Sequence, residues 1–321
     1  MRFFGIDSEL DRRRIQALRA DPPGRASSGA RRSIFGAALE QWDALLQASA
    51  DVVPAAAPIL LFYALPQAGR AVSAAHVRGQ PFRSRGHGLR IGDPTGDLGA
   101  ALVQPEGGPN TSFAMFCRAT GSPGLTAATT LGALWAANPK LEVVANLGDR
   151  ETPALELMQI SGDPPTRALI RGDLAEALPA DDHEAVAELR SRLGRYPGVA
   201  DGLVINNASP RISRDGTPQV EVSWRSADET ARAISLVAPG YGRSNSGAFL
   251  RPALNAAGDV LDYLPLWWAT LLTLSSLARY HPEAWTAALV RDTARTAVPI
   301  EEALDIGREM LPWLLLGVLR P

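Results

Sequence analysis

Hydrophobic and polar positions follow a helical period early in the chain. From Ile34 to Ala50 apolar residues recur at intervals of three and four, which predicts an amphipathic helix with Ser33 as its N-cap. The charged segment 7–30 before it is typical of a short helix followed by a loop. A further helix is predicted after Pro54, with Pro58 in its first turn. Because that helix is apolar on nearly every side, we expect it to be central.

Short apolar runs bounded by Gly, Pro and Asp replace this pattern beyond Gly79. Such runs are typical of β-strands, because strands are short and their turns need these residues. The clearest signal is a β-hairpin over 203–224, where two strand-like runs flank turn residues that include Asp215-Gly216. Further strands are predicted over 87–93, 99–106, 111–120 and 231–239.

Helical spacing returns within the middle region and dominates the end of the chain. A helix is predicted over 126–137, and the charged stretch 177–193 predicts an exposed helix that leaves His183 in solvent. In the C-terminal part, Pro282 and Pro299 each stand where a helix can begin, because proline there loses no useful donor.

The longest apolar stretch runs from Leu261 to Ala278. It contains Asp262 and Pro265 and is rich in Ser and Thr, which favours a buried helix over a membrane span. We therefore expect no membrane partner. The C-terminal tryptophans are predicted to be core residues: Trp267, Trp268 and Trp285.

The order of helices, then strands, then helices predicts an α+β fold that is mainly helical. The N- and C-terminal helices are expected to pack together, with a β-rich insert in the middle. Without repeated alternation of strand and helix, a doubly wound nucleotide-binding sheet is excluded. The predicted parts are a charged segment 1–32, a helical part 33–80, a β-rich middle 81–260 and a C-terminal helical part 261–321 that forms one unit with 33–80.

Charge and cysteine usage narrow the function classes. The 32 basic and 34 acidic residues give a net charge of −2, which argues against non-specific electrostatic binding to nucleic acid or to an anionic membrane. Lys140 is the one lysine, and Cys117 is the one cysteine. Cys117 lies in an apolar run, so we expect a buried, inert thiol. The acidic, arginine-rich start of the chain is unlike a secretory signal, and together these features predict a cytoplasmic protein.

Motifs for metals and nucleophiles are missing from the sequence. The four histidines, including His183 and His281, show no His-x-His or His-Glu-x-x-His spacing, so no metal site is predicted. No Gly-x-Ser-x-Gly elbow is present either. We expect no cofactor.

The stretch 52–92 contains no acidic residue but many basic ones, which makes it the strongest local feature. If its loop folds over the end of the apolar helix, the guanidinium groups could converge on a phosphate or carboxylate. The competing interpretation is that acids elsewhere, for example in 141–190, pair with them. Its basic residues are Arg70, His76, Arg78, Arg83, Arg85, His87 and Arg90.

A second acid-free stretch, 230–258, contains the glycine-rich segment APGYGRSNSG. Its backbone could form an anion nest. The glycine spacing matches neither the dinucleotide fingerprint nor the phosphate loop, and a plain turn between strands is the alternative.

Several segments together resemble a known bacterial family. PILLFYALPQAGRAV followed by GHGL, then TTLGALWAANPKL and LLTLSSLARYHPEAW, are similar to the YaaC-like family over most of the chain from about residue 34. That family is functionally uncharacterised, so the resemblance implies a cytoplasmic bacterial protein and no particular reaction.

A more distant similarity is to HEPN domains, helical units of which some are ribonucleases with an Arg, four to six residues and a His. Arg70 and His76 fit that spacing. The resemblance implies that Arg70 stabilises a phosphate oxyanion while His76 transfers a proton. On a straight helix, however, six positions leave the two side chains about 120° apart around the axis and roughly 9 Å apart along it. Ala71 also replaces the polar residue that usually follows the arginine.

The sequence thus favours a regulatory or defence-associated module that binds an anionic ligand, such as a nucleotide or RNA. An HEPN-type, metal-independent ribonuclease using Arg70 and His76 is the first alternative. The second is a structural protein whose C-terminal tail, Trp313 to Leu319, docks on another copy or subunit. For Arg279, a structural role that bridges the two helical parts is the alternative to ligand binding. The predicted ligand-binding residues are Arg78, Arg83, Arg85, His87, Arg90 and Arg279.

Overall fold

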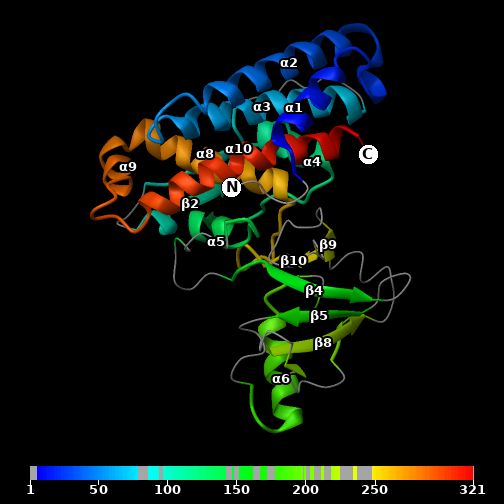
Figure 1. Ribbon diagram of the computed structural model, residues 1–321, viewed down its shortest axis with the longest axis vertical. Coiled ribbons are helices and arrows are strands. Elements are labelled where there is room, and N and C mark those ends of the chain that lie inside the picture. Colours follow the sequence, from blue (N-terminus) through cyan, green and yellow to red (C-terminus); the bar gives the residue numbers. More distant parts are fainter. Residues whose placement is uncertain are drawn as a thin grey trace.

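Helices lie at one end of the computed structural model, and a β-sheet with helix α6 (Asp182–Leu193) lies at the other (Figure 1). The structure describes residues 6–78, 86–93, 97–141, 147, 152–161, 167–171, 178–197, 199, 203–205, 211–212, 218–224, 234–236 and 248–320.

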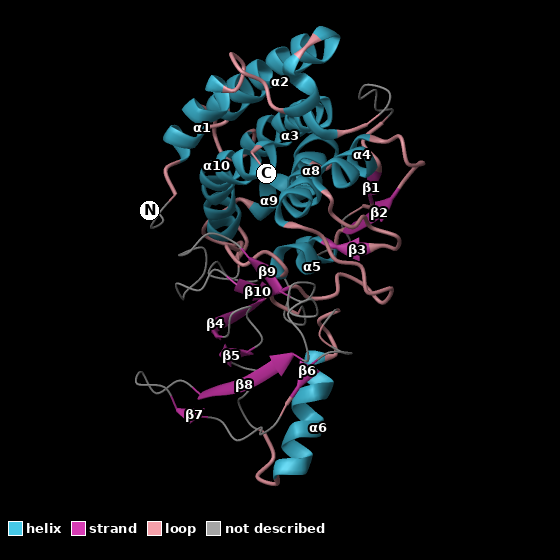
Figure 2. Ribbon diagram, turned by 90° about the vertical axis from the view of Figure 1, so that its right-hand side faces the viewer, coloured by secondary structure: helices cyan, strands magenta, loops and turns pink. Residues whose placement is uncertain are grey.

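The helical part joins the two ends of the chain. Helix α1 packs against α10, and α3 packs against α2, α8 and α10 (Figure 2). This arrangement confirms a mainly helical α+β fold in which N- and C-terminal helices pack together. The helices are α1 (Ser8–Ala17), α2 (Gly29–Ala48), α3 (Ala57–His76), α4 (Ser112–Thr120), α5 (Leu131–Ala136), α8 (Tyr263–Tyr280), α9 (Pro282–Ala288) and α10 (Ala297–Leu319).

Helices α3 and α8 form the centre of this part. Each residue of α8 from 263 to 277 is buried, as expected for the apolar stretch. The ring of Phe116 in α4 packs on Trp268 of α8, with centroids 4.8 Å apart. Gly69 of α3 fits beside them, because a Cβ there would lie 3.1 Å from Phe116. The core role predicted for the tryptophans is confirmed at Trp267, Trp268 and Trp285.

The strand predicted over 111–120 is wrong, because these residues form helix α4. Phe113, Phe116 and Cys117 are buried and follow the i, i+3, i+4 spacing of one helix face. The helix ends at Gly121, whose φ of 74° is the left-handed conformation that closes many helices. A short run of apolar and aromatic residues fits either element, and here packing against α3 selects the helix.

Two predicted helix starts also need correction. Helix α2 begins at Gly29, so Ser33 lies inside it instead of capping it. Helix α5 covers only Leu131–Ala136 of the predicted 126–137. The preceding Thr129–Thr130 pair forms strand β3, and the Thr130 hydroxyl caps α5 by accepting from the amide of Ala133.

A small antiparallel sheet lies beside the helical part (Figure 2). Its order is β1 (Leu89–Ile91), β2 (Leu102–Pro105) and β3, with Leu89 opposite Pro105 and Leu102 opposite Thr130. Strands β1 and β2 confirm the strands predicted over 87–93 and 99–106.

The larger antiparallel sheet has the order β6, β8, β5, β4, β10, β9, with β7 also paired to β8. Pairing of β7 with β8 confirms the predicted hairpin over 203–224, and β9 confirms the strand over 231–239. The turn at Asp215-Gly216 and the segment 238–247 lie outside the described residues. The strands are β4 (Leu155–Ser161), β5 (Arg167–Arg171), β6 (Leu203–Val204), β7 (Arg211–Ile212), β8 (Pro218–Trp224), β9 (Ile234–Leu236) and β10 (Ala248–Leu250).

The large sheet has a hydrophobic core of its own. Leu189 and Leu193 of α6 pack there with Ile170, Val220 and Val222 of the sheet. Helix α6 begins after Asp181, whose carboxylate accepts from two backbone amides, and His183 is exposed as predicted. A separate and larger cluster fills the helical part and extends from α1 to the end of α10.

The C-terminal tail packs on this larger core. Leu315 and Leu319 are fully buried, and Trp313 packs against the same cluster. The apolar side chains of the tail Trp313 to Leu319 are thus largely occupied within the chain. Among the described residues, no helix combines the length and apolar character that crossing a membrane requires.

Candidate functional site

The described arginines of the acid-free stretch form no ion pair. Arg70 donates from Nη1 to the Gln67 side chain at 3.0 Å, and Arg90 donates to the Gln104 side chain across β1 and β2. Arg78 is exposed just beyond α3. Among the described residues, none of these three arginines pairs with an acid from 141–190. The predicted ligand-binding residues Arg83 and Arg85 lie outside the described part of the chain.

His76 is the last residue of α3 and is partly buried. Its Nε2 atom is buried without a hydrogen-bond partner among the described residues. Burial lowers the pKa of His76, and the backbone of Val318 near the end of α10 opposes this shift only in part. Arg70, by contrast, is exposed and bonded to Gln67. The two residues of the predicted Arg/His pair thus have separate surroundings.

His87 occupies a turn that the backbone fixes. The flanking Gly86 and Gly88 have φ angles of 69° and 88°. The first amides of α4, from Ser112 and Phe113, donate to the carbonyls of Gly86 and His87 at 3.2 and 3.0 Å. A side chain at Gly88 would collide with Thr111, because a Cβ there would lie 2.4 Å from its Oγ1. Both glycines and the start of α4 therefore set the position of the imidazole.

The imidazole of His87 packs on aromatic rings of α3. Its ring centroid lies 5.4 Å from that of Phe62 and 6.5 Å from that of Tyr63, with edge-on geometry in both cases. Tyr63 is the exposed member of this pair, since Phe62 is fully buried. The ring of Tyr63 also contacts a cationic group from α8.

That cationic group is the guanidinium of Arg279. Its Nη1 donates to the hydroxyls of Tyr63 at 3.1 Å and Tyr280 at 3.3 Å, and its Nε donates to the carbonyl of Ser275 at 3.1 Å. The Cζ atom lies 5.6 Å from the ring centre of Tyr63 and 4.8 Å from that of Tyr280. The predicted bridge between the two helical parts is therefore present at this residue.

Tyr63, His87, Arg279 and Tyr280 together form what we call the Arg279 cluster. No carboxylate pairs with Arg279 among the described residues. Burial, and then the positive charge of Arg279, lower the pKa of His87. A neutral imidazole and a fixed guanidinium therefore share one surface region, which favours an anion over a cation as its ligand.

An acidic side chain lies beside the residue that follows Tyr280. The Asp93 carboxylate, which is almost fully exposed, lies 3.5 Å from Nε2 of His281. His281 is the residue between the end of α8 and the start of α9. Asp93 thus pairs with His281 and not with Arg279.

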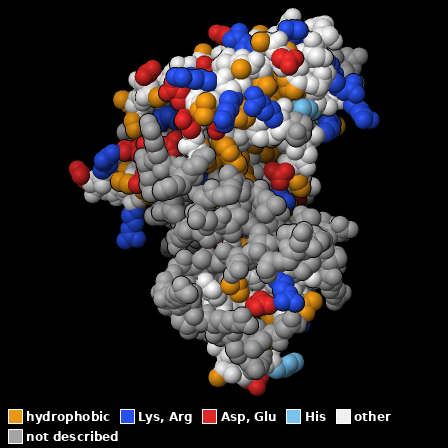
Figure 3. Space-filling model, turned by 45° about the vertical axis from the view of Figure 1, so that its right-hand side comes forward, with side chains coloured by type: hydrophobic (Ala, Val, Ile, Leu, Met, Phe, Trp, Pro, Cys, Tyr) orange, Lys and Arg blue, Asp and Glu red, His pale blue; other side chains and the backbone are white. Residues whose placement is uncertain are grey.

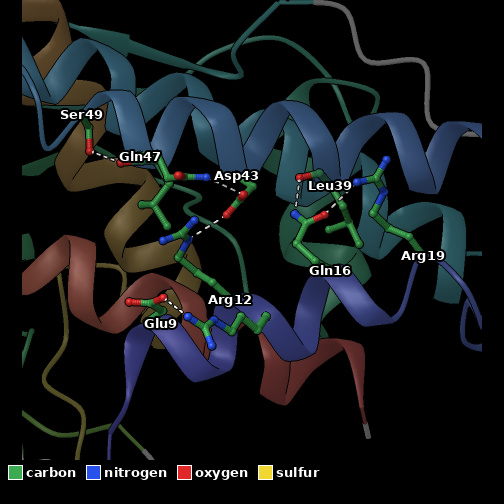
Figure 4. A network of polar contacts seen from close by, with 10 residues as sticks. Glu9, Arg12, Gln16, Arg19, Leu39, Asp43, Gln47 and Ser49 are labelled. Carbon is green, nitrogen blue, oxygen red and sulfur yellow. Dashed lines mark hydrogen bonds and ion pairs between the residues drawn. The ribbon is translucent and has the colours of Figure 1, made fainter.

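A polar groove of about 240 Å³ lies elsewhere, between α1 and α2 (Figure 4). Arg12 donates to Asp43 at 2.7 Å, and Arg13 pairs with Glu9. Gln16, which also lines the groove, donates to the carbonyl of Leu39. Because its two arginines and two acids neutralise each other, this groove offers no net charge to a ligand.

Sequence reasoning missed a buried polar group at the junction of the helical part and the large sheet. Lys140 is only 3% exposed, and burial lowers its pKa to about 8 despite the nearby charges of Glu156 and Glu309. Asn138, which is fully buried, leaves its Nδ2 atom without a hydrogen bond among the described residues. The signal was available, since Lys140 is the one lysine among 32 basic residues.

Sequence reasoning also missed Tyr63 and Tyr280. Tyr63 is hidden within the apolar run ILLFYAL, although a phenol in such a run carries a polar group that needs a partner. Tyr280 adjoins Arg279 in the sequence. Among the described residues, no group of three or more His, Cys, Asp or Glu side chains could hold a metal ion.

Comparison with known proteins gives one match. A protein-family model described as YaaC-like Protein matches residues 10–319, nearly the whole chain. Comparison with curated proteins finds no match, and neither does comparison with solved structures.

Proposed function

The chain belongs to the YaaC-like protein family, and we propose that it is a regulatory module that binds an anionic ligand through Arg279. One observation carries this proposal. The Arg279 guanidinium is held by three hydrogen bonds, yet it has no acidic partner among the described residues. The proposal keeps the anion chemistry expected from the arginine-rich stretch and places its centre at the end of α8, beside His87.

The chemistry of the cluster suits a phosphate or carboxylate group. The guanidinium keeps a permanent positive charge, and each of its free N–H groups can donate a charge-assisted hydrogen bond to an anionic oxygen. The hydrogen bonds of Nε and Nη1 leave the Nη2 group of Arg279 available to a ligand. Because Tyr63, Tyr280 and Ser275 already fix the guanidinium, binding costs little side-chain entropy.

Calorimetric titration of the full chain with inorganic pyrophosphate tests the proposal. Arg279→Ala should weaken binding by roughly tenfold or more, because a charge-assisted hydrogen bond is lost. Arg291→Ala is the matched control, since Arg291 is exposed and paired with Glu301, and it should bind within twofold of wild type. Arg279→Lys, which keeps the charge but not the planar guanidinium, should fall between them. Wild-type affinity in a folded Arg279→Ala variant would overturn the proposal.

A metal-independent ribonuclease that uses Arg70 and His76 is the second candidate function. One observation favours it: the lowered pKa of His76 leaves a neutral imidazole that can accept a proton near neutral pH. RNA is incubated in EDTA with wild type, Arg70→Ala and His76→Ala. Cleavage that both variants lose supports the enzyme, and intact RNA with wild type excludes it. Neither residue belongs to the Arg279 cluster, so this result is independent of the pyrophosphate titration.

A further inference from the structure

We infer that the ligand of the Arg279 cluster is a mononucleotide, whose phosphate binds Arg279 and whose base stacks on Tyr280. This inference rests on the proposed function and names the ligand class for the same site. It requires a free aromatic surface, a single anion position beside it and a rigid frame that holds both.

Tyr280 supplies the aromatic surface. Its side chain is 67% exposed although it ends the otherwise buried helix α8, and Tyr63 beside it is 37% exposed. Aromatic side chains that present this much surface are suited to stacking on nucleobases. The Arg279 guanidinium lies over one face of the Tyr280 ring, with Cζ 4.8 Å from the ring centre, so a base would stack on the opposite face. One small ligand with a planar ring and a phosphate can therefore contact both groups at once.

The charges around the cluster suit one phosphate group better than the backbone of a nucleic-acid strand. A protein that follows a nucleic-acid backbone needs several unpaired cations along the path. Arg70 and Arg90 are held by Gln67 and Gln104, and among the described contacts neither bonds to a residue of the cluster. On the face of the helical part that Figure 3 shows, basic and acidic side chains are interspersed and form no continuous basic track. The described residues of the cluster thus provide one anion position, at Arg279.

The frame of the cluster is rigid. His87 is fixed by Gly86, Gly88 and the first turn of α4, and its ring lies against Tyr63. Tyr63 belongs to α3 and Arg279 to α8, which pack together at the centre of the helical part. A site preorganised in this way loses little free energy on ordering and can distinguish a nucleotide from its fragments.

Titration calorimetry with four probes tests the inference: AMP, adenosine, inorganic phosphate and a ten-nucleotide RNA. AMP should bind at least tenfold more tightly than phosphate or adenosine, because only AMP engages both groups. Tyr280→Ala should weaken AMP binding roughly tenfold and change phosphate binding less than twofold. Tyr280→Phe, which keeps the ring, should bind AMP within threefold of wild type. Added salt should weaken AMP binding only modestly, because a single phosphate releases no condensed counterions and its ion pair is merely screened.

The outcomes separate this inference from the proposed function. If Arg279→Ala abolishes phosphate binding but AMP binds no more tightly than phosphate, the mononucleotide is ruled out and anion binding stands. If RNA binds far more tightly than AMP, and its binding depends much more steeply on salt, the ligand is a nucleic-acid strand and the inference is wrong. If no probe binds, or if Arg279→Ala changes nothing, both fail.

Discussion

Arg279 and Tyr63 lie 216 residues apart in the sequence, yet Nη1 of Arg279 donates to the Tyr63 hydroxyl at 3.1 Å. The bond joins the end of α8 to the first half of α3. The same guanidinium also donates to the carbonyl of Ser275 within α8. Bridging the helices and binding an anion are therefore compatible roles, because the bridge holds the guanidinium where a ligand can reach it.

Removing the Tyr63 hydroxyl should show how much this hydrogen bond contributes to the stability of the fold. Tyr63→Phe deletes the acceptor of Arg279 and keeps the ring, so we expect the free energy of unfolding to fall by about 0.5–1.5 kcal/mol. Urea denaturation measures this change. Tyr280→Phe is the control and should lose a few tenths of a kcal/mol at most, because its hydroxyl is well exposed and its bond is longer, at 3.3 Å. If Tyr63→Phe is as stable as wild type, the bond between Arg279 and Tyr63 does not stabilise the fold.

Trp268 should be among the most costly residues to truncate. It is fully buried and contacts Phe62, Phe113 and Phe116. Trp268→Ala should lower the free energy of unfolding by about 3–5 kcal/mol, because a large cavity remains between α3, α4 and α8. Val298→Ala, at a position that is 49% exposed, should cost less than about 0.5 kcal/mol in the same urea titration. Comparable losses in the two variants would contradict the packing.

Helix α2 could be predicted from its apolar period, since burial of one face forces that period. Helices α3 and α8 could be predicted from their long apolar stretches, and α6 from a charged stretch. Strand β4 could not be predicted from the sequence. Its pairing with β5 shifts register between Leu157 and Gln159, and such an irregularity disrupts the alternation that identifies a strand. Helix α4 was mistaken for a strand because its apolar and aromatic composition suits both elements.

The site was predictable only in part. His87 is visible in the sequence as part of the acid-free stretch 52–92, and Arg279 as a candidate bridge between the two helical parts; both belong to the observed cluster. Their common neighbour Tyr63 could not be identified, because its contact with Arg279 depends on how α3 and α8 pack. Local spacing also favours Arg70 and His76 as a catalytic pair. In the folded chain, however, Arg70 bonds to Gln67, and His76 lies near the end of α10.

Cys117 should be inert in the folded chain. The predicted burial is confirmed at 3% exposure, and burial, with the charge of Asp262, raises the pKa of its thiol to about 12. At pH 8 a thiol reagent such as iodoacetamide should label the native chain at least a hundredfold more slowly than the urea-unfolded chain, because only the thiolate reacts. Mass spectrometry follows the labelling. Similar rates in both states would show that the thiol is accessible.

Asp259 should make the fold sensitive to acid. Its carboxylate accepts from Thr126, Ala127 and Asn255. Burial alone would raise its pKa, but these hydrogen bonds outweigh burial, and the pKa lies below its usual value of 3.8. A lowered pKa stabilises the folded chain above the unfolded value, and this contribution is lost as the pH falls through the folded value.

Asp259→Asn tests this contribution. The variant should be less stable than wild type by about 1–2 kcal/mol at pH 6, since charge-assisted hydrogen bonds are lost. The difference should shrink below pH 3.8, where wild type also loses the charge. Urea denaturation at several pH values measures it. A difference that stays constant down to pH 2.5 would assign the effect to packing.

Lys140 should make the free energy of unfolding depend on pH in the alkaline range. Burial lowers its pKa from 10.5 to about 8, although Glu156 and Glu309 oppose the shift. Between these two values the unfolded chain binds more protons than the folded chain, so the free energy of unfolding rises with pH across this window. The rise should approach ~3 kcal/mol relative to Lys140→Met, which has nothing to titrate at this position.

Lys140→Arg is the matched control, because arginine stays charged throughout the window and should show no such rise. Urea denaturation of the three proteins at pH 7.5, 9 and 10.5 measures these differences. A constant gap between wild type and Lys140→Met would mean that Lys140 keeps its proton in the fold, with its charge compensated by neighbouring groups.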